Sequence, residues 1–249
     1  MTTPKVSVLM PCLNPKPEWF RIAARGIANQ SYENLDLVIA DNGSDGTTVG
    51  IIKKLQEENP DNVLSARRPE PKGTAYALDA ALGIADPKTI YFSKADADDI
   101  FHPDREKNRV EFFEKLPPQI AVLYDNYLQL VYHPRPHIIP IILRPYDYRL
   151  LCEQSYIPGN SMYRASVYDK IPMTYVYDGY DGKANKHGED YAHWLSITDH
   201  WDAFWYDQDP ALTWTYRFYR ESKYNRDKKG VDFARAHIQH MAKERRNLL

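Results

Sequence analysis

Short apolar segments alternate with longer amphipathic segments over the first hundred residues of the chain. The short segments have the pattern of buried strands, and the longer ones repeat apolar residues at helical spacing. In residues 18–30, for example, Phe20, Ala23, Ala24 and Ile27 share one helical face. The pattern predicts strands at residues 5–10, 35–40, 62–66 and 89–93, and helices at residues 18–30, 45–58 and 74–85.

Strands that alternate with helices of this length indicate βαβ units, and therefore an α/β fold with a mostly parallel sheet. The loops that follow such strands lie along one edge of the sheet, where ligands bind in open α/β folds. Here the loops at residues 11–14, 41–46 and 96–99 carry most of the unusual polar residues. The pattern therefore predicts a nucleotide site that is built from these loops.

The second half of the chain is less regular. Strand-like segments at residues 121–132 and 138–143 suggest a small antiparallel excursion, after which residues 156–163 return to the main sheet. Residues 177–183 are rich in Gly, Asp and Tyr, which is typical of a mobile lid. Without a repeat or a linker, residues 1–249 are interpreted as a single domain. The other predicted elements are helices at residues 103–116, 187–199 and 231–249, and strands at residues 203–206 and 212–218.

Composition and charge narrow the class of protein. Hydrophobic residues make up 43% and charged residues 27% of the chain, as in an ordinary globular protein, and the net charge of −2 gives no electrostatic case for nucleic-acid binding. Two cysteines, and no signal-peptide or membrane-spanning pattern, favour a cytoplasmic location. The 19 tyrosines and 5 tryptophans are compatible with a carbohydrate site, although plain core aromatics explain them equally well.

Three carboxylates lie within four residues, at Asp96, Asp98 and Asp99, directly after the strand predicted at residues 89–93. Carboxylates this close repel one another, so a hard cation such as Mg²⁺ or Mn²⁺ is expected to neutralise them and to hold substrate phosphates. A solvated acidic turn is the alternative, because short motifs of this kind also occur by chance.

Six segments in a fixed order resemble the family 2 glycosyltransferases, which have the GT-A fold. The resemblance is close over roughly residues 4–105 and looser over residues 155–220. The segments are VSVLMPCLN at 6–14, QSYENL at 30–35, IADNGSDGT at 39–47, KGTAYAL at 72–78, ADADD at 95–99 and GEDY at 188–191.

The resemblance implies that residues 1–100 bind the nucleotide-sugar donor. Asp41 would accept a hydrogen bond from the base, usually uracil, and Gly73 would allow close approach of the backbone. The family often has a second Asp where this chain has Asn42, and this difference could soften the preference for one base. The implied donor-binding residues of this half are Pro11, Asn14, Asp41, Asn42, Lys72, Gly73 and Asp96.

The same resemblance implies that residues 101–249 bind the acceptor and supply the catalytic base. Asp98 would be the principal ligand of Mn²⁺ or Mg²⁺, with Asp96 near the ribose and the metal. Asp190 would be the base and Glu189 the fallback, although both could instead be an acidic cap at a helix start. Arg217 and Arg220 could reach the diphosphate, and residues 159–162 look like the acceptor-side loop.

The implied activity is inverting, metal-dependent transfer of a sugar, most often from a UDP-sugar, to a hydroxyl of a glycan, a lipid-linked acceptor or a protein glycan. Lys94 lies just before Asp96, where the family usually has an apolar residue, and it could pair with a carboxylate or a phosphate. The basic helix at residues 231–249 could lie on an anionic membrane surface, or could simply be solvated.

Two alternatives remain open. A nucleotidyltransferase that builds nucleotide-sugars would carry a Gly-rich basic loop after the first strand, but residues 11–17 contain no glycine. A catalytically silent relative of the same fold would lack the carboxylates at positions 98 and 190. His102, His187 and His193 would be metal ligands only if they face Asp98. The sequence leaves the sugar, the acceptor and the oligomeric state open.

Overall fold

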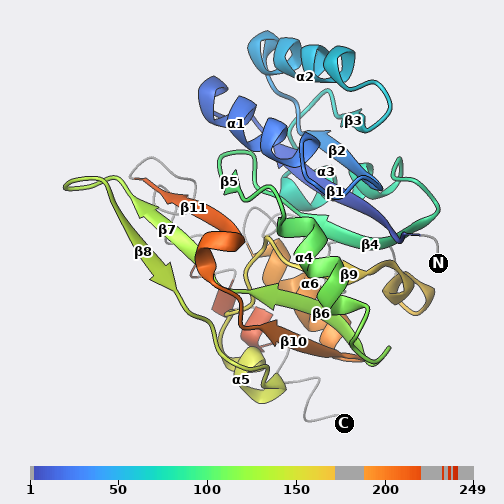
Figure 1. The fold of residues 1–249 in the computed structure, drawn as a ribbon, viewed down its shortest axis with the longest axis vertical. Helices are drawn as coiled ribbons and strands as arrows, with labels where there is room; N and C mark the ends of the chain where they lie inside the picture. Colours follow the sequence, from blue (N-terminus) through green and yellow to red (C-terminus); the bar gives the residue numbers. More distant parts are fainter. Residues whose placement is uncertain (1–2, 172–187, 220–231, 233–234, 237, 241–249) are drawn as a thin grey trace.

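The computed structural model describes residues 3–171, 188–219, 232, 235–236 and 238–240 (Figure 1). The helices and strands within these residues are β1 (Lys5–Cys12), α1 (Pro17–Ala28), β2 (Leu35–Asp41), α2 (Gly46–Glu58), β3 (Val63–Arg67), α3 (Thr74–Leu82), β4 (Thr89–Lys94), β5 (Ile100–Phe101), α4 (Arg105–Phe113), β6 (Ile120–Asp125), β7 (Tyr127–Val131), β8 (His137–Ile141), α5 (Tyr148–Glu153), β9 (Met162–Arg164), α6 (Glu189–Thr198), β10 (Asp202–Tyr206) and β11 (Trp214–Phe218), with short 3₁₀ helices η1 (Ala165–Asp169) and η2 (Pro210–Leu212).

The main sheet has seven strands in the order β10-β6-β9-β4-β1-β2-β3. Only β9 runs against its neighbours β4 and β6, so the prediction of a mostly parallel sheet is confirmed. Register places Cys12 opposite Asp41, and Leu9 opposite Lys94. Because β1, β2 and β4 are parallel, the loops that follow them meet at one edge of the sheet.

Helices cover both faces of this sheet, as expected for α/β architecture (Figure 1). Alternate residues along β1 point to opposite faces, so Val8 belongs to the core cluster that includes residues of α1, α2 and α4, whereas Leu9 belongs to the cluster that includes residues of α3, α5 and α6. The helix predicted at residues 45–58 begins with an N-cap, because Asp45 accepts hydrogen bonds from the backbone N–H groups of Thr47 and Thr48. Both faces are therefore closed, and the carboxyl edge remains the place for a ligand.

The segment predicted as one strand at residues 121–132 is two strands in two sheets, so that prediction was wrong. β6 belongs to the main sheet, and β7 to a second sheet in the order β5-β11-β7-β8. Asn126 lies at the corner. Its side-chain amide donates to Asp207 Oδ1 (2.9 Å) and to the Gln208 carbonyl (3.0 Å), and its Oδ1 accepts from Trp205 Nε1 (2.9 Å). These bonds stabilise the bend between β6 and β7. The pattern of apolar residues along the chain does not show this bend.

Other predictions need smaller corrections. The helix predicted at residues 103–116 is limited to α4, and the return at residues 156–163 forms only the short strand β9. Strand β5 and helix α5 were not predicted. The lid at residues 177–183, His187, Arg220 and most of the helix at residues 231–249 lie outside the described residues. No helix among the described residues combines the length and apolarity needed to cross a membrane.

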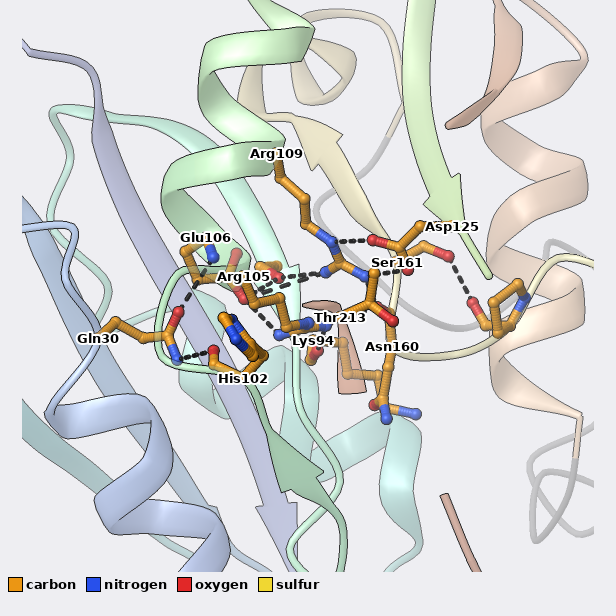
Figure 2. Close-up of polar contacts among 12 residues, drawn as sticks. Gln30, Lys94, His102, Arg105, Glu106, Arg109, Asp125, Asn160, Ser161 and Thr213 are labelled. Atoms are coloured by element: carbon orange, nitrogen blue, oxygen red, sulfur yellow. Dashed lines mark hydrogen bonds and ion pairs between the residues drawn. The ribbon is translucent and has the colours of Figure 1, made fainter. Parts of the chain in front are cut away.

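A buried network of charged side chains joins α4 to β4, to β6 and to the segment before β9, near the carboxyl edge of the sheet (Figure 2). Arg109 donates from Nε to Asp125 Oδ2 (2.6 Å) and from Nη2 to Asp125 Oδ1 (2.7 Å). Its Nη2 also donates to the Asn160 carbonyl (2.8 Å). Arg105 Nη2 donates to the same carbonyl (2.7 Å) and to the Lys94 carbonyl (3.0 Å). The two arginines therefore fix two loops of the candidate site to α4.

Replacing Arg109 by Met should lower the free energy of unfolding by about 3–5 kcal/mol, because it leaves the buried Asp125 carboxylate without its cation. Arg25→Met is the matched control. Arg25 forms an exposed pair with Glu58 (3.1 Å), and its loss should cost no more than about 1 kcal/mol. Urea unfolding of both variants measures the difference. Equal stability of the two variants would show that the buried pair is not important for the fold.

Candidate active site

The loops after β1 and β2 are tied to each other by short polar contacts. Asn14 has a left-handed backbone (φ +47°), its N–H donates to Ser44 Oγ (3.1 Å), and its Oδ1 accepts from the Asp45 N–H (2.7 Å). Asp41 Oδ1 accepts from the Ser44 N–H (2.8 Å). Asp41 Oδ2 lies 3.6 Å from Arg67 Nε, and it accepts no hydrogen bond from the described residues. One buried carboxylate oxygen is therefore left for a ligand.

The loop before α3 contacts the loop that follows β2. The Lys72 N–H donates to Asn42 Oδ1 (3.1 Å), and Gly73 precedes α3 with a φ of +113°. Gly43, with a φ of +87°, lies so close to Pro71 that a Cβ there would be 2.9 Å from the Pro71 nitrogen. The structure thus brings most of the predicted donor-binding residues of the first half to one edge of the sheet.

The acidic loop after β4 divides its three carboxylates between two environments. Asp99 is fully buried, where its Oδ2 accepts from Asn160 Nδ2 (2.8 Å) and its Oδ1 from the Arg217 N–H (3.1 Å). Asp96 keeps 38% of its side chain exposed. Burial and the charge of Asp96 raise the pKa of Asp98. Asp96 and Asp98 are thus the carboxylates that can serve a ligand, whereas Asp99 holds the loop together.

Arg217 and Tyr219 hold the acidic loop from β11 and the residue that follows it. Arg217 Nη1 donates to the carbonyls of Asp98 and Asp99, and its guanidinium lies 5.2 Å from the ring of Trp19. Tyr219 Oη donates to Asp98 Oδ2 (2.7 Å). The Arg217 side chain therefore supports the loop directly, and its contact with a diphosphate stays a prediction.

Lys94 lies between the acidic loop and the start of α6. Its Nζ donates to both oxygens of Asp190 (2.8 and 3.0 Å) and is 3.3 Å from Asp96 Oδ1. Burial raises the pKa of Asp190 to about 6; Lys94 opposes this rise, and Glu189 and Asp96 add to it. The pKa of Lys94 is itself raised, mainly by Asp190, despite complete burial. A fixed ammonium therefore joins the predicted metal loop to the predicted base.

Gly159 leaves the space in which this ion pair forms. A Cβ at this position would be 2.4 Å from Asp190 Oδ2 and 3.0 Å from Lys94 Nζ. The next residue, Asn160, accepts from the Asp96 N–H through Oδ1 (3.0 Å). The segment predicted as the acceptor-side loop thus contacts both the acidic loop and the carboxylate of Asp190.

A hard divalent cation fits the chemistry of Asp96 and Asp98. Within the described part of the chain, no three His, Cys, Asp or Glu side chains are grouped as a complete metal site. Asp96 and Asp98 repel each other, and Mg²⁺ usually takes one or two protein carboxylates and completes its shell with phosphate oxygens and water. The protein side chains thus offer part of a coordination shell, which a diphosphate would complete.

Of the three histidines considered as metal ligands, the two that the structure describes, His102 and His193, have other partners. His102 Nδ1 accepts from the Asp104 N–H (3.2 Å), and His193 packs against the rings of Tyr163 and Trp194. The sequence interpretation missed Tyr219 as a partner of Asp98. No signal in the sequence points to that contact, because the two residues are far apart in the chain and only the fold joins them.

A mostly parallel sheet with carboxylates at its carboxyl edge, and with two helix-covered faces, is the architecture of the GT-A glycosyltransferases. The chain also matches the sequence model described as Glycosyl transferase family 2 over residues 7–172. This match covers more than half of the chain. The protein therefore belongs to glycosyltransferase family 2, as the motifs predicted.

Curated relatives share this assignment. An uncharacterized glycosyltransferase of Haemophilus influenzae is 25% identical over 207 residues, which are 78% of this chain and 60% of that protein. The Escherichia coli UDP-Glc:alpha-D-GlcNAc-diphosphoundecaprenol beta-1,3-glucosyltransferase WfaP is 27% identical over 122 residues, which are 49% of this chain and 45% of that protein. The chain thus spans less than two thirds of either relative.

Solved structures confirm the fold. The mannosyltransferase PcManGT from Pyrobaculum calidifontis, in complex with GDP-Man and Mn²⁺, superposes with a TM-score of 0.64 at 19% identity, covering 98% of this chain and 65% of that one. Residues 1–349 of S. aureus TarS in complex with UDP give a TM-score of 0.61 at 16% identity, covering 87% and 61%. At this identity the likeness shows the GT-A fold alone.

Proposed function

We propose that this protein transfers a sugar, with inversion, from a nucleoside-diphosphate sugar to a hydroxyl of a glycan or lipid-linked acceptor. Asp190 is the base, and Asp96 and Asp98 hold a divalent cation. The observation that carries the proposal is the Lys94 ammonium, which bridges Asp190 at 2.8 Å and Asp96 at 3.3 Å. Lys94 thus holds the proposed base beside the loop that would bind the diphosphate. A single displacement needs the base and the leaving group close to the same sugar carbon.

The donor would lie along the carboxyl edge of β1, β2 and β4. Asp41 Oδ2, which accepts no hydrogen bond from the described residues, is available to a base N–H. Gly73, which has a positive φ and no Cβ, would allow the backbone before α3 to approach the phosphates closely, whereas Gly43 packs against Pro71. A divalent cation at Asp96 and Asp98 would offset the charge that the diphosphate gains as the glycosidic bond breaks.

Asp190 is suited to removing the proton of the acceptor hydroxyl. Its pKa of about 6 leaves most of the carboxyl groups ionised at neutral pH while keeping the group basic enough to take a proton. One base and one displacement invert the anomeric centre, so no second carboxylate is needed as a nucleophile. Glu189, the neighbouring residue, remains the fallback for this role.

A UDP-sugar is the proposed donor. The E. coli relative is named as a UDP-Glc enzyme, and TarS binds UDP, whereas the Pyrobaculum structure contains GDP-Man. The E. coli relative also acts on a diphosphoundecaprenol acceptor, which supports a lipid-linked acceptor as one option here. The geometry of Asp41 alone does not separate uracil from guanine, since both bases offer a ring N–H.

Calorimetric titration with UDP and with GDP, each with Mn²⁺ and with EDTA, tests the donor site. We expect UDP to bind in the presence of Mn²⁺ and to lose this binding in EDTA and in Asp98→Ala. The control Asp61→Ala, at an exposed carboxylate outside the site, should bind as the wild type does. Preference for GDP would change the donor but keep the enzyme class, and failure of both nucleotides to bind would refute the proposed donor site.

A further inference from the structure

The β7–β8 hairpin projects from the body of the protein, and its turn points away from the main sheet (Figure 1). β7 pairs with β11 on one side and with β8 on the other, so β8 is the edge of the second sheet. Every residue from His133 to Pro140 is exposed. The hairpin is therefore available to a partner along much of its length.

The exposed side chains of this hairpin are unusually apolar. Ile138 and Ile142 each keep 59% of their surface exposed, and Ile139 keeps 39%. Ile138, Pro140 and Ile142 are two residues apart, so they share one side of the strand and its extension. Ile138, Pro140 and Ile142 therefore form an exposed apolar surface on that side, of the kind that marks an interaction site.

The charged side chains of the hairpin and its flanking residues are all basic. Residues 126–146 contain no Asp or Glu, although about one residue in seven of the whole chain is acidic. Arg135, at the turn, and Arg144, just after Ile142, are both exposed. Isoleucines between two arginines, without a carboxylate, match the boundary of a bilayer, where acyl chains lie beneath anionic headgroups.

A second copy of the chain fits this surface less well than a lipid surface does. Pairing of two β8 edges would require a row of free N–H groups, and Pro140, the fourth of the five residues of β8, lacks one. Two copies would also bring Arg135 and Arg144 near their own counterparts, without an acidic residue of the hairpin to neutralise them. The apolar and basic character together favours lipid.

We propose that the β7–β8 hairpin docks on an anionic lipid surface, with Ile138 and Ile142 at the acyl boundary and with Arg135 and Arg144 against lipid phosphates. This lipid contact does not depend on the proposed reaction. Where that reaction holds, β7 would place the surface near the active site, because its neighbour β11 carries Arg217, which binds the Asp98 and Asp99 carbonyls.

Cosedimentation with vesicles tests this proposal. Vesicles of phosphatidylcholine with about one third phosphatidylglycerol should bind the protein, and high salt should weaken binding. In the double variant Ile138→Ser with Ile142→Ser, the affinity for these vesicles should fall at least about tenfold. The control, Ile22→Ser with Ile90→Ser, changes two isoleucines that are each 48% exposed on α1 and β4, and should bind normally.

The other outcomes overturn the proposal. No binding of the wild type, or equal loss in the two double variants, would exclude the hairpin as the lipid contact. A dimer mass in native mass spectrometry that falls to the monomer mass only in the Ile138→Ser/Ile142→Ser variant would assign the surface to a second copy. Calorimetric UDP binding, measured on the same samples, separates a failed lipid contact from a failed donor site.

Discussion

Asp190→Asn is expected to reduce the rate of sugar transfer by about 10²- to 10⁴-fold and to leave nucleotide binding unchanged. The amide keeps an oxygen that can accept from Lys94, which donates to both carboxylate oxygens in the wild type. It cannot take a proton from the acceptor hydroxyl. The loss should therefore appear in kcat, while calorimetric UDP binding and the melting temperature stay near those of the wild type.

Glu189→Gln is the matched control for this variant, because it removes the neighbouring carboxylate at the same helix start and keeps both groups that form the Lys94–Asp190 hydrogen bonds. We expect less than a tenfold loss in this variant. Near-normal turnover of Asp190→Asn, together with a large loss in Glu189→Gln, would transfer the role of base to Glu189. Near-normal turnover of both variants would refute a carboxylate base at the start of α6.

Lys94→Met is expected to shift the acidic limb of the pH profile of kcat/KM upward by about one unit or more. The base must be ionised, so activity is lost as the pH falls through the pKa of Asp190, which is about 6 in the wild type. The Lys94 charge favours the ionised carboxylate, whereas burial, Glu189 and Asp96 oppose ionisation. Without Lys94 the pKa rises, and a rise of one unit lowers the ionised fraction at pH 7 from about nine tenths to about one half, so activity at neutral pH should fall by about twofold or more.

Lys5→Met provides the control for the Lys94 experiment. Lys5 forms a partly buried pair with Asp36 (2.6 Å) at the opposite end of β1, so its removal changes a similar ion pair far from the carboxyl edge. The pH profile of this variant should match that of the wild type. If Lys94→Met also keeps the wild-type profile, the ammonium does not control the ionisation of Asp190, and its role would be limited to the fold.

The first half of the chain could be predicted because its signals are local. Strands buried on both faces read as apolar runs, and the helices between them show one apolar face, so the order and type of the elements are confirmed. The three loops at the carboxyl edge follow from the parallel order of the strands, which brings Asp41 and Asp96 to one side of the sheet.

The second half could not be predicted in the same way, because long-range polar contacts decide its structure. Asn126 ends one strand through bonds to Trp205 and Asp207, which are about eighty positions further along the chain. Arg105 and Arg109 are fully buried, although charged residues in a helix pattern normally indicate a solvated face. Only the complete fold shows the carboxylates and carbonyls that make this burial possible.

Asn160 has a consequence for redesign of this enzyme. Its side chain accepts from the Asp96 N–H and donates to Asp99, and its carbonyl accepts from both buried arginines. The segment predicted as the acceptor-side loop is therefore joined to the acidic loop by hydrogen bonds of one residue. Libraries intended to change acceptor selectivity should keep this asparagine fixed and vary other positions, since its substitution would remove hydrogen bonds that hold the acidic loop of the proposed donor site.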